Sequence, residues 1–510
     1  MSSFCAPTRN GTALYKKTTR TGPVIAVAAF AAFLATFNET FLNVAFVPIM
    51  GDFGVGEETV QWLVTGYMLG AAVMVPVTAF LYRTVSTGRL FLFSVGFLVV
   101  GSVVGALAPS FAVLLTGRVL QAVGTGMLIP IGMNITLAVA PREKLGAYLG
   151  LMGAMTTLGP SVSIIAAGSL LVVTGWTTLL WVFGALSALC FAAGATVLGD
   201  VAVLTHPRLD PMSVVTISLA LVGILYGIST LFFGNLVTAA AAVVIGAVSL
   251  VVFVRRQFRL DEPLLDLSTL RNVPFALGVV MNMLTLVVIF AMNILIPIYV
   301  QSTLGEPALA AALALFPAIL LSAIVAPLAG RWYDRRGPRL LLPAGFGLIA
   351  VFAVLVAAVI PTGSLPLVAL AYVPVICGSA LVIGPVQSFA VSHLAGHQHP
   401  HGVTVMSTGF QLAGCIGSSV FVGVYAAASA ASTRPANDAA SAGFLAAGLA
   451  ASACAVAGLI IALVAVRHTP STGPTSTVTS STPTSAASPP DRHDLPAETP
   501  FRRPPKAADA

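Results

Sequence analysis

The sequence predicts an all-α polytopic membrane protein with fourteen membrane-spanning helices. Hydrophobic residues make up 57% of the 510 residues and charged residues only 8%, too few charges to cover the surface of a soluble globular protein of this size. Apolar runs of about twenty residues, the length that crosses a bilayer as a helix, recur along almost the whole chain. Every second loop between these runs is basic, as the positive-inside rule requires of a polytopic protein.

Polar, Gly-rich and Pro-rich segments interrupt the apolar runs and set the limits of the spans. The predicted spans cover residues 23–49, 60–82, 90–107, 112–138, 145–172, 176–198, 212–231, 236–254, 274–301, 308–328, 340–360, 366–391, 403–428 and 442–466. Of the 24 Lys and Arg residues, only Arg434 falls opposite the basic loops and only Arg118 falls within a span. One missed helix would destroy this alternation, so both termini are predicted to be cytoplasmic in a multi-pass protein of the plasma (inner) membrane.

Fourteen spans divide into six, two and six. The predicted parts are a cytoplasmic N-terminal tail (1–22), an N-terminal six-helix bundle (23–199), two linker helices with a cytoplasmic loop (200–273), a C-terminal six-helix bundle (274–466) and a disordered cytoplasmic tail (467–510). The last part is predicted to be disordered because it is rich in Pro, Ser and Thr and has no apolar periodicity.

The first span carries an acid at membrane depth. Glu39 is the only one of the 17 Asp and Glu residues within a predicted span, and a carboxylate there costs on the order of 3 kcal/mol. Arg118 lies at a similar depth in span 4, so the two side chains can meet if their helices are neighbours. A change of exposure would load and release a proton on such a pair, which predicts proton coupling through Glu39 and Arg118. A static pair, or a protonated acid bonded to a neighbouring helix, is the alternative.

Other function classes lack their signatures. The sequence has no Gly-Lys-Ser/Thr phosphate-binding motif and no catalytic constellation, so we expect neither an enzyme nor a cofactor. Its five cysteines show no pairing or metal spacing, and the four histidines between His393 and His401 are interpreted as a polar loop without a metal. The basic residues are spread over many short loops, so no nucleic-acid partner is predicted.

Five stretches of the chain resemble motifs of one family, in the right order and at the right spans. They are residues 38–45 in span 1, 114–124 in span 4, 263–271 before span 9, 330–339 after span 10 and 411–417 in span 13. They are similar to the major facilitator superfamily and, within it, to the fourteen-helix drug:proton antiporters of the EmrB/QacA and lincomycin-resistance type. The resemblance implies the major facilitator fold, alternating access and proton-coupled export of hydrophobic or amphipathic small molecules.

The resemblance also implies a conformational gate at the cytoplasmic face, in which side chains clasp helix ends and favour the outward-facing state. The residues that match it are Gly330, Asp334, Arg335, Gly337 and Arg339. The equivalent stretch after span 2 has Ala79 and Arg83 where the motif has Gly and Asp, and span 5 has Ser163 and Ile164 where the antiporter signature has a Gly pair.

Polar and aromatic side chains in the motif-bearing or equivalent spans are predicted to face a substrate. These candidates are Asn38, Phe41, Asn43, Gln121, Asn134, Asn293 and Gln411. Hydrogen bonding between helices is the alternative role for such residues, as for Asn282 and Gln387. Export of an endogenous metabolite, lipid or peptide without proton coupling is the alternative function, and a non-transporting membrane sensor is a further one.

Overall fold

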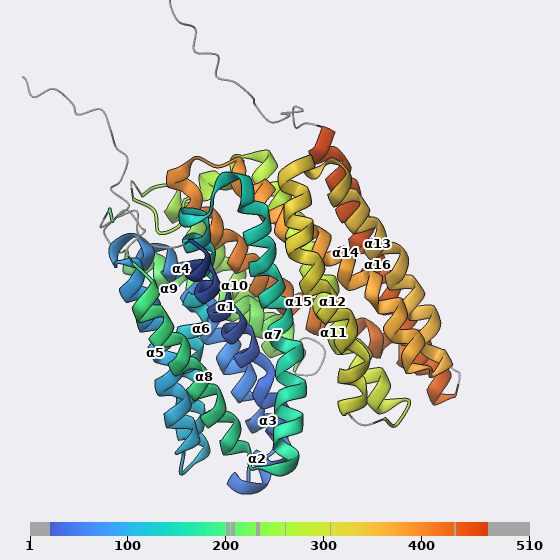
Figure 1. The fold of residues 1–510 in the computed structure, drawn as a ribbon. Helices are drawn as coiled ribbons and strands as arrows, with labels where there is room; N and C mark the ends of the chain where they lie inside the picture. Colours follow the sequence, from blue (N-terminus) through green and yellow to red (C-terminus); the bar gives the residue numbers. More distant parts are fainter. Residues whose placement is uncertain are drawn as a thin grey trace, which may run out of the picture. The chain divides into compact units, whose positions relative to one another are not determined.

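The computed structural model describes residues 21–199, 204–205, 210–230, 235–260, 262–306, 308–432 and 435–467. Fourteen helices within these residues are long and apolar enough to cross a membrane (Figure 1), which confirms the predicted fold class. The predicted terminal tails lie almost entirely outside the described residues.

The first span consists of three segments. They are α1 (Thr21–Thr40), the 3-10 helix η1 (Phe41–Ala45) and α2 (Phe46–Phe53). The predicted span over residues 23–49 is present, within Thr21–Phe53, but the helix changes geometry inside it. Pro48 has no N–H to bond the carbonyl of residue 44 and its ring crowds that carbonyl. A new helix therefore begins at Phe46, which places Pro48 in its first turn.

The remaining helices follow with short connections. The N-terminal half continues with α3 (Glu57–Val60), α4 (Trp62–Thr84), α5 (Thr87–Ala106), α6 (Phe111–Val139), η2 (Arg142–Lys144), α7 (Leu145–Val173) and α8 (Trp176–Val197). The middle of the chain holds α9 (Pro211–Thr230), α10 (Leu236–Gln257) and η3 (Leu267–Arg271). The C-terminal half holds α11 (Val273–Ser302), α12 (Ala308–Arg336), α13 (Pro338–Val359), η4 (Ile360–Thr362), α14 (Leu365–Ser392), η5 (Gly396–Gln398), α15 (His399–Ala431) and α16 (Ala436–Arg467).

Two large hydrophobic cores organise these helices. One is formed by residues of α1 to α8, and the other by residues of α11 to α16. We call the two groups of helices the N-bundle and the C-bundle. They meet mainly through α7, which packs against α12 and α14, and through α15, which packs against α4 and α6.

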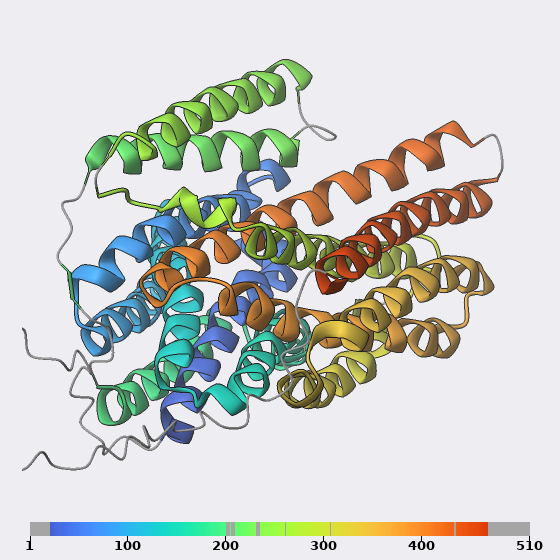
Figure 2. The same ribbon diagram turned by 90° about the horizontal axis from the view of Figure 1, so that it is seen from above.

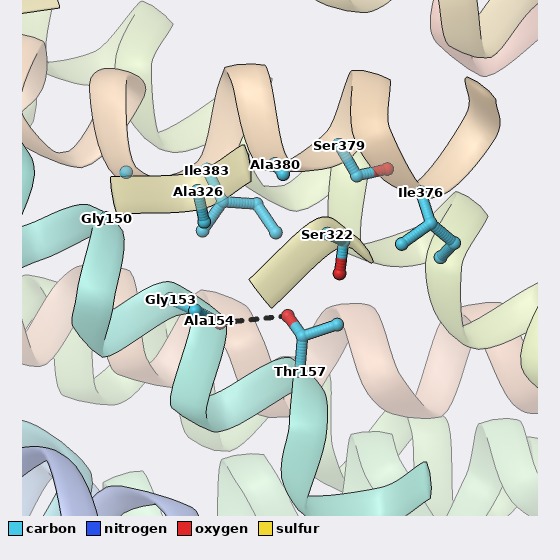
Figure 3. Close-up of a pocket in the computed structure, with 11 residues that line it drawn as sticks. Gly150, Gly153, Ala154, Thr157, Ser322, Ala326, Ile376, Ser379, Ala380 and Ile383 are labelled. Carbon is cyan, nitrogen blue, oxygen red and sulfur yellow. Dashed lines mark hydrogen bonds between the residues drawn. The ribbon is translucent and has the colours of Figure 1, made fainter. Parts of the chain in front are cut away.

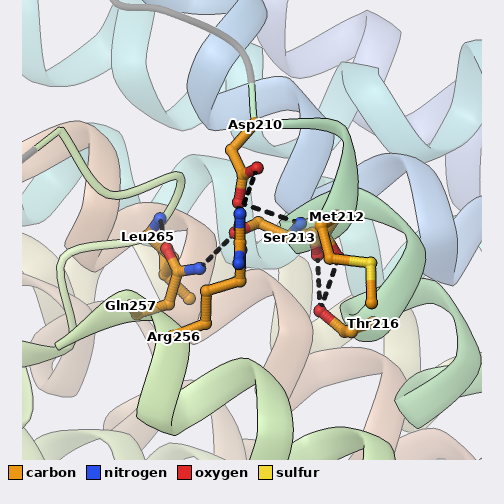
Figure 4. A network of polar contacts seen from close by, with 7 residues as sticks. All are labelled: Asp210, Met212, Ser213, Thr216, Arg256, Gln257 and Leu265. Carbon is orange, nitrogen blue, oxygen red and sulfur yellow. Dashed lines mark hydrogen bonds and ion pairs between the residues drawn. The ribbon is translucent and has the colours of Figure 1, made fainter. Parts of the chain in front are cut away.

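The linker helices α9 and α10 lie side by side at one edge of the helices (Figure 2). One polar network ties their ends together (Figure 4): Arg256 of α10 donates two hydrogen bonds, of 2.6 and 2.8 Å, to Asp210 before α9. Gln257 donates to the Ser213 hydroxyl at 2.7 Å and accepts from the Leu265 N–H at 3.2 Å. The Arg256 guanidinium holds the pKa of Asp210 well below its usual range.

Candidate functional site

Arg118 lies at the centre of the N-bundle with 1% of its surface exposed. Its Nη1 donates to the side-chain and main-chain oxygens of Asn38, at 2.9 and 3.1 Å, and to Gln121 Oε1 at 2.9 Å. Its Nε donates to the carbonyl of Leu63 at 3.2 Å, and its guanidinium carbon lies 4.1 Å from the centre of the Tyr67 ring. The carbonyl of Asn38 belongs to the last turn of α1, where the switch to 3-10 geometry leaves carbonyls without helical partners. The break in the first span therefore supplies an acceptor for the buried cation.

Glu39 is buried next to this network with 6% of its surface exposed. In the described part of the chain, no hydrogen bond or ion pair joins it to Arg118, so the expected direct contact is not present. Successive helical positions point about 100° apart, and here the amide of Asn38 rather than the carboxyl of Glu39 faces the guanidinium. The next residue, Thr40, shares a 2.6 Å hydrogen bond with Ser163 of α7. Ser163, one of the departures from the antiporter signature, thus couples α7 to the residue beside Glu39.

A small cavity lies where the two bundles meet, and we call it the inter-bundle cavity. It is formed by α6 and α7 of the N-bundle and by α11, α14 and α15 of the C-bundle. Three side chains in its wall have buried polar atoms that lack a hydrogen-bond partner in the described structure: Asn282 Oδ1, Gln387 Oε1 and Ser407 Oγ. The apolar part of the wall includes Ile129, Met133, Met152, Met406 and Phe410.

The inter-bundle cavity has a volume of about 20 Å³, which is room for about one water molecule. A buried polar atom without a partner costs about 1–3 kcal/mol, and three such atoms converge here. The arrangement can hydrogen-bond a small polar group, while flexible methionines adapt to apolar groups of varied shape. A larger molecule requires the bundles to separate at this point.

Small residues let the bundles approach closely beside this cavity. A void of about 10 Å³ between α7, α12 and α14 is lined by Gly150, Gly153, Thr157 and Ser322 among others (Figure 3). Thr157 donates its hydroxyl proton to the Gly153 carbonyl at 2.9 Å, so the hydroxyl is satisfied within its own helix. A Cβ on Gly384 of α14 would lie 2.6 Å from the Gly150 Cα, so this crossing requires glycine.

The residues predicted to face a substrate do not converge on one cavity. Asn38, Phe41 and Gln121 are fully or almost fully buried around Arg118, where Phe41 also stacks on Phe183. Three further candidates have other surroundings: Asn43 is exposed, Asn134 is buried with its Nδ2 unpartnered, and Asn293 accepts from the Tyr372 hydroxyl at 2.7 Å. Gln411 lines a separate pocket between α4, α9 and α15. Their predicted role stays a prediction.

The gate residues lie at the junction of α7 and α12. Helix α12 continues to Arg336, so Gly330, Asp334 and Arg335 are on a helix and not, as expected, in a loop. Only Gly337, with φ of 72°, separates α12 from α13, which contains Arg339. The apolar run marks where the helix leaves the hydrocarbon, but its backbone hydrogen bonds continue into the polar region.

Asp334 binds the N-terminal end of α7 across the boundary between the bundles. Its Oδ1 accepts from the Gly146 N–H at 2.8 Å and its Oδ2 from the Ala147 N–H at 3.1 Å. These N–H groups have no partners within their own helix, and the helix dipole favours a negative charge at this position. Gly330 lies directly against the Gly146 carbonyl, which leaves no room for a side chain. The clasp of a helix end predicted for Asp334 is therefore present.

A second junction joins α4 of the N-bundle to α15 of the C-bundle. In the predicted topology it lies on the same side of the membrane as the turn between α12 and α13. Arg83 Nη1 lies 3.1 Å from His401 Nε2, and the Asp266 N–H donates to His401 Nδ1 at 3.2 Å. Both ring nitrogens thus face donors. Arg83 takes the position at which the gate motif has Asp. It contacts the C-bundle through His401. No pattern in the sequence predicts this contact, because Arg83 and His401 are far apart in the chain.

The residues that line the inter-bundle cavity were not predicted from the sequence as one site. Asn282 and Gln387 were visible as polar residues in apolar spans, which was a usable signal. Ser407 and the three methionines do not stand out in the sequence, because Ser and Met are ordinary residues of membrane helices. Their convergence depends on five helices from both halves of the chain.

Comparison with known sequences places the chain among transport proteins. Residues 28–418 match the family model described as Major Facilitator Superfamily. The chain is 31% identical over 410 residues to the lincomycin resistance protein LmrB of Listeria monocytogenes, covering 79% of this chain and 86% of that protein. It is 30% identical over 409 residues to LmrB of Bacillus subtilis, with 79% and 85% covered. The multidrug resistance protein B homolog of Mycobacterium tuberculosis is 30% identical over 420 residues, with 77% and 74% covered.

Solved structures show the same fold. The human organic anion transporter MFSD10 superposes with a TM-score of 0.59 at 15% identity, covering 87% of this chain and 99% of that one. The proton:xylose symporter XylE superposes with a TM-score of 0.63 at 12% identity, covering 88% and 96%.

Proposed function

Because this chain belongs to the Major Facilitator Superfamily, and is thus a membrane transporter, we propose that it exports apolar or amphipathic drug-like compounds, antibiotics among them, in exchange for protons. The relatives named for resistance to lincomycin and to multiple drugs support this substrate class. The observation that carries the proposal is the inter-bundle cavity. Its methionine-rich wall suits apolar groups of varied shape, and its three unpartnered polar atoms suit one polar group of the substrate.

Proton coupling is assigned to Glu39. It is a buried acid, and among the described residues no hydrogen bond or ion pair joins it to Arg118. Helix α7 packs on the C-bundle with its first half and holds Thr40 through Ser163 with its second half. A movement of the bundles therefore changes the surroundings of Glu39, and with them its affinity for a proton.

The two junctions at Asp334 and His401 support alternating access between the bundles. Both hold the N-bundle and C-bundle together at the end that the positive-inside rule assigns to the cytoplasm. The conformation described here thus corresponds to a state closed toward the cytoplasm of a protein in the plasma membrane. Opening toward the cytoplasm requires both junctions to break, and it enlarges the inter-bundle cavity enough to admit a substrate.

The test is transport by the full-length protein in inverted membrane vesicles with an imposed pH gradient. Lincomycin and a panel of lipophilic dyes serve as substrates. The variants are Glu39→Gln and the double variant Asn282→Ala, Gln387→Ala. Glu306→Gln is the matched control, because Glu306 is an exposed acid beyond the end of α11.

We expect the wild type and Glu306→Gln to show gradient-driven transport. We expect Glu39→Gln to show none. The double variant is expected to raise KM for polar panel members by about thirty-fold, since two hydrogen bonds of about 1 kcal/mol each are lost. Equal gradient-driven transport by Glu39→Gln and wild type would remove Glu39 from the mechanism. Failure to transport any panel member, with the protein inserted, would instead favour export of an endogenous metabolite.

A further inference from the structure

A cleft separate from the inter-bundle cavity opens between the beginning of α7 and the end of α12. It has a volume of about 570 Å³, and its wall includes Lys144 of η2 and Arg331 and Arg335 of α12. The apolar part of the wall includes Tyr148, Leu151 and Pro327. The same two arginines also line a groove of about 510 Å³, together with Leu328, Trp332 and Arg336. Of these groups only Arg335 belongs to the predicted gate, and none lines the inter-bundle cavity.

The cations of this cleft lack acidic partners. Lys144, Arg331, Arg335 and Arg336 are exposed, and among the described residues none of the four forms a recorded ion pair with an acid. Two acids also line the cleft, but both oxygens of Asp334 accept backbone N–H groups, which leaves the exposed Glu143. Positive charge therefore predominates, and an arginine pair suits the paired oxygens of a phosphate.

The exposed face of α12 indicates the source of that phosphate. Four aliphatic side chains that are 48–57% exposed follow one another along the helix at spacings of seven, four and four residues: Leu313, Leu320, Ile324 and Leu328. Arg331 and Arg335 continue this stripe at spacings of three and four, and residues at such spacings share one helix face. Trp332, which is 37% exposed, lies beside them, as is typical of the membrane–water interface.

We propose that this cleft binds the phosphate of an anionic phospholipid of the cytoplasmic leaflet, with its acyl chains along the aliphatic stripe of α12. Arg331 and Arg335 bind the phosphate from the C-bundle, and Lys144 binds it from the N-bundle. Basic pockets between spanning helices on this side of a membrane recognise such headgroups. Since the lipid contacts both bundles beside the Asp334 junction, it stabilises the arrangement that is closed at this end.

The experiment reconstitutes the full-length protein in nanodiscs of phosphatidylcholine with or without phosphatidylglycerol. Native mass spectrometry measures lipid retained after delipidation. The variant is Arg331→Gln, Arg335→Gln. Its matched control is Arg255→Gln, Arg259→Gln, which removes two exposed arginines with the same four-residue spacing, one in the last turn of α10 and one just after it. Arg331→Lys, Arg335→Lys keeps the charges and serves if the glutamine variant is unstable.

We expect the wild type and the control to retain phosphatidylglycerol in preference to phosphatidylcholine. The glutamine variant is expected to lose that preference by on the order of thirty-fold, and the lysine variant by less. An equal loss in both glutamine variants would indicate general surface charge and overturn the proposal, as would no loss in either. In lipid-free detergent, stabilisation by inorganic phosphate as large as that by short-chain phosphatidylglycerol would assign the cleft to free anions and also overturn it.

Discussion

Replacement of Asp334 by Asn tests whether the contact with α7 holds the bundles closed. Asparagine keeps one acceptor oxygen but loses the charge and the second acceptor, so one of the two backbone N–H groups of Gly146 and Ala147 loses its bond. A hydrogen bond to a charged group contributes about 1.5–3 kcal/mol, and a charge at a helix N-terminus about 0.3–1 kcal/mol. We therefore expect the closed state to lose about 2 kcal/mol relative to the open state, which shifts their ratio about thirty-fold.

Pulsed electron paramagnetic resonance measures this shift directly. Spin labels at Arg89→Cys of α5 and Leu340→Cys of α13 report the distance between the bundles, because both positions are exposed at the first turn of their helices. The native cysteines are replaced by alanine. Asp438→Asn, at an exposed acid in the first turn of α16, is the control. A longer-distance population should grow in Asp334→Asn and not in the control. An unchanged distance distribution in Asp334→Asn would refute the reasoning.

Two further predictions concern the stability of the fold. Gly330→Ala should destabilise the protein by about 1–3 kcal/mol, because the new methyl group meets the Gly146 carbonyl. Thermal unfolding in detergent measures this, with Gly347→Ala as the control whose methyl group meets nothing within 4 Å; equal melting temperatures would show that α7 and α12 do not hold this contact. The Asp210→Asn variant should have a lower free energy of unfolding than the wild type, by a constant amount between about pH 5 and 8. Arg256 lowers the pKa of Asp210 in the folded state, so the stabilisation by the Asp210 carboxylate is fully present above its unfolded pKa of about 4. The difference should shrink as the pH falls below that value in denaturant titrations, and a difference that grows in acid would contradict the ion-pair explanation.

The candidate site shows where sequence reasoning reached its limit. Glu39 and Arg118 were recognisable from the sequence because a charge inside an apolar run is visible without any neighbour. Their direct contact was not borne out, because Asn38 occupies the position that faces the guanidinium. One residue of helical rotation decides between the two, and no composition or motif records that rotation.

Asp334 illustrates the opposite case. Its motif predicted a clasp on a helix end, and it does bind two N–H groups of α7. The helix end that it binds, on the other bundle, could not be named in advance. The Arg83–His401 contact was not predicted at all, since it replaces a familiar acid by a pair of residues 318 positions apart.

The sequence by itself determined that this protein has fourteen membrane-spanning helices and an acid within the first of them. Each segment of the sequence determines these properties separately. In a bilayer every span must form its own backbone hydrogen bonds and be long enough to cross the hydrocarbon layer, whichever helices surround it. The tertiary structure alone decided the partner of Arg118, the walls of the inter-bundle cavity and the cation-lined cleft. Each of these depends on which faces of distant helices meet. Lipid offers no hydrophobic preference among those faces, so close packing of small residues and hydrogen bonds between side chains select them.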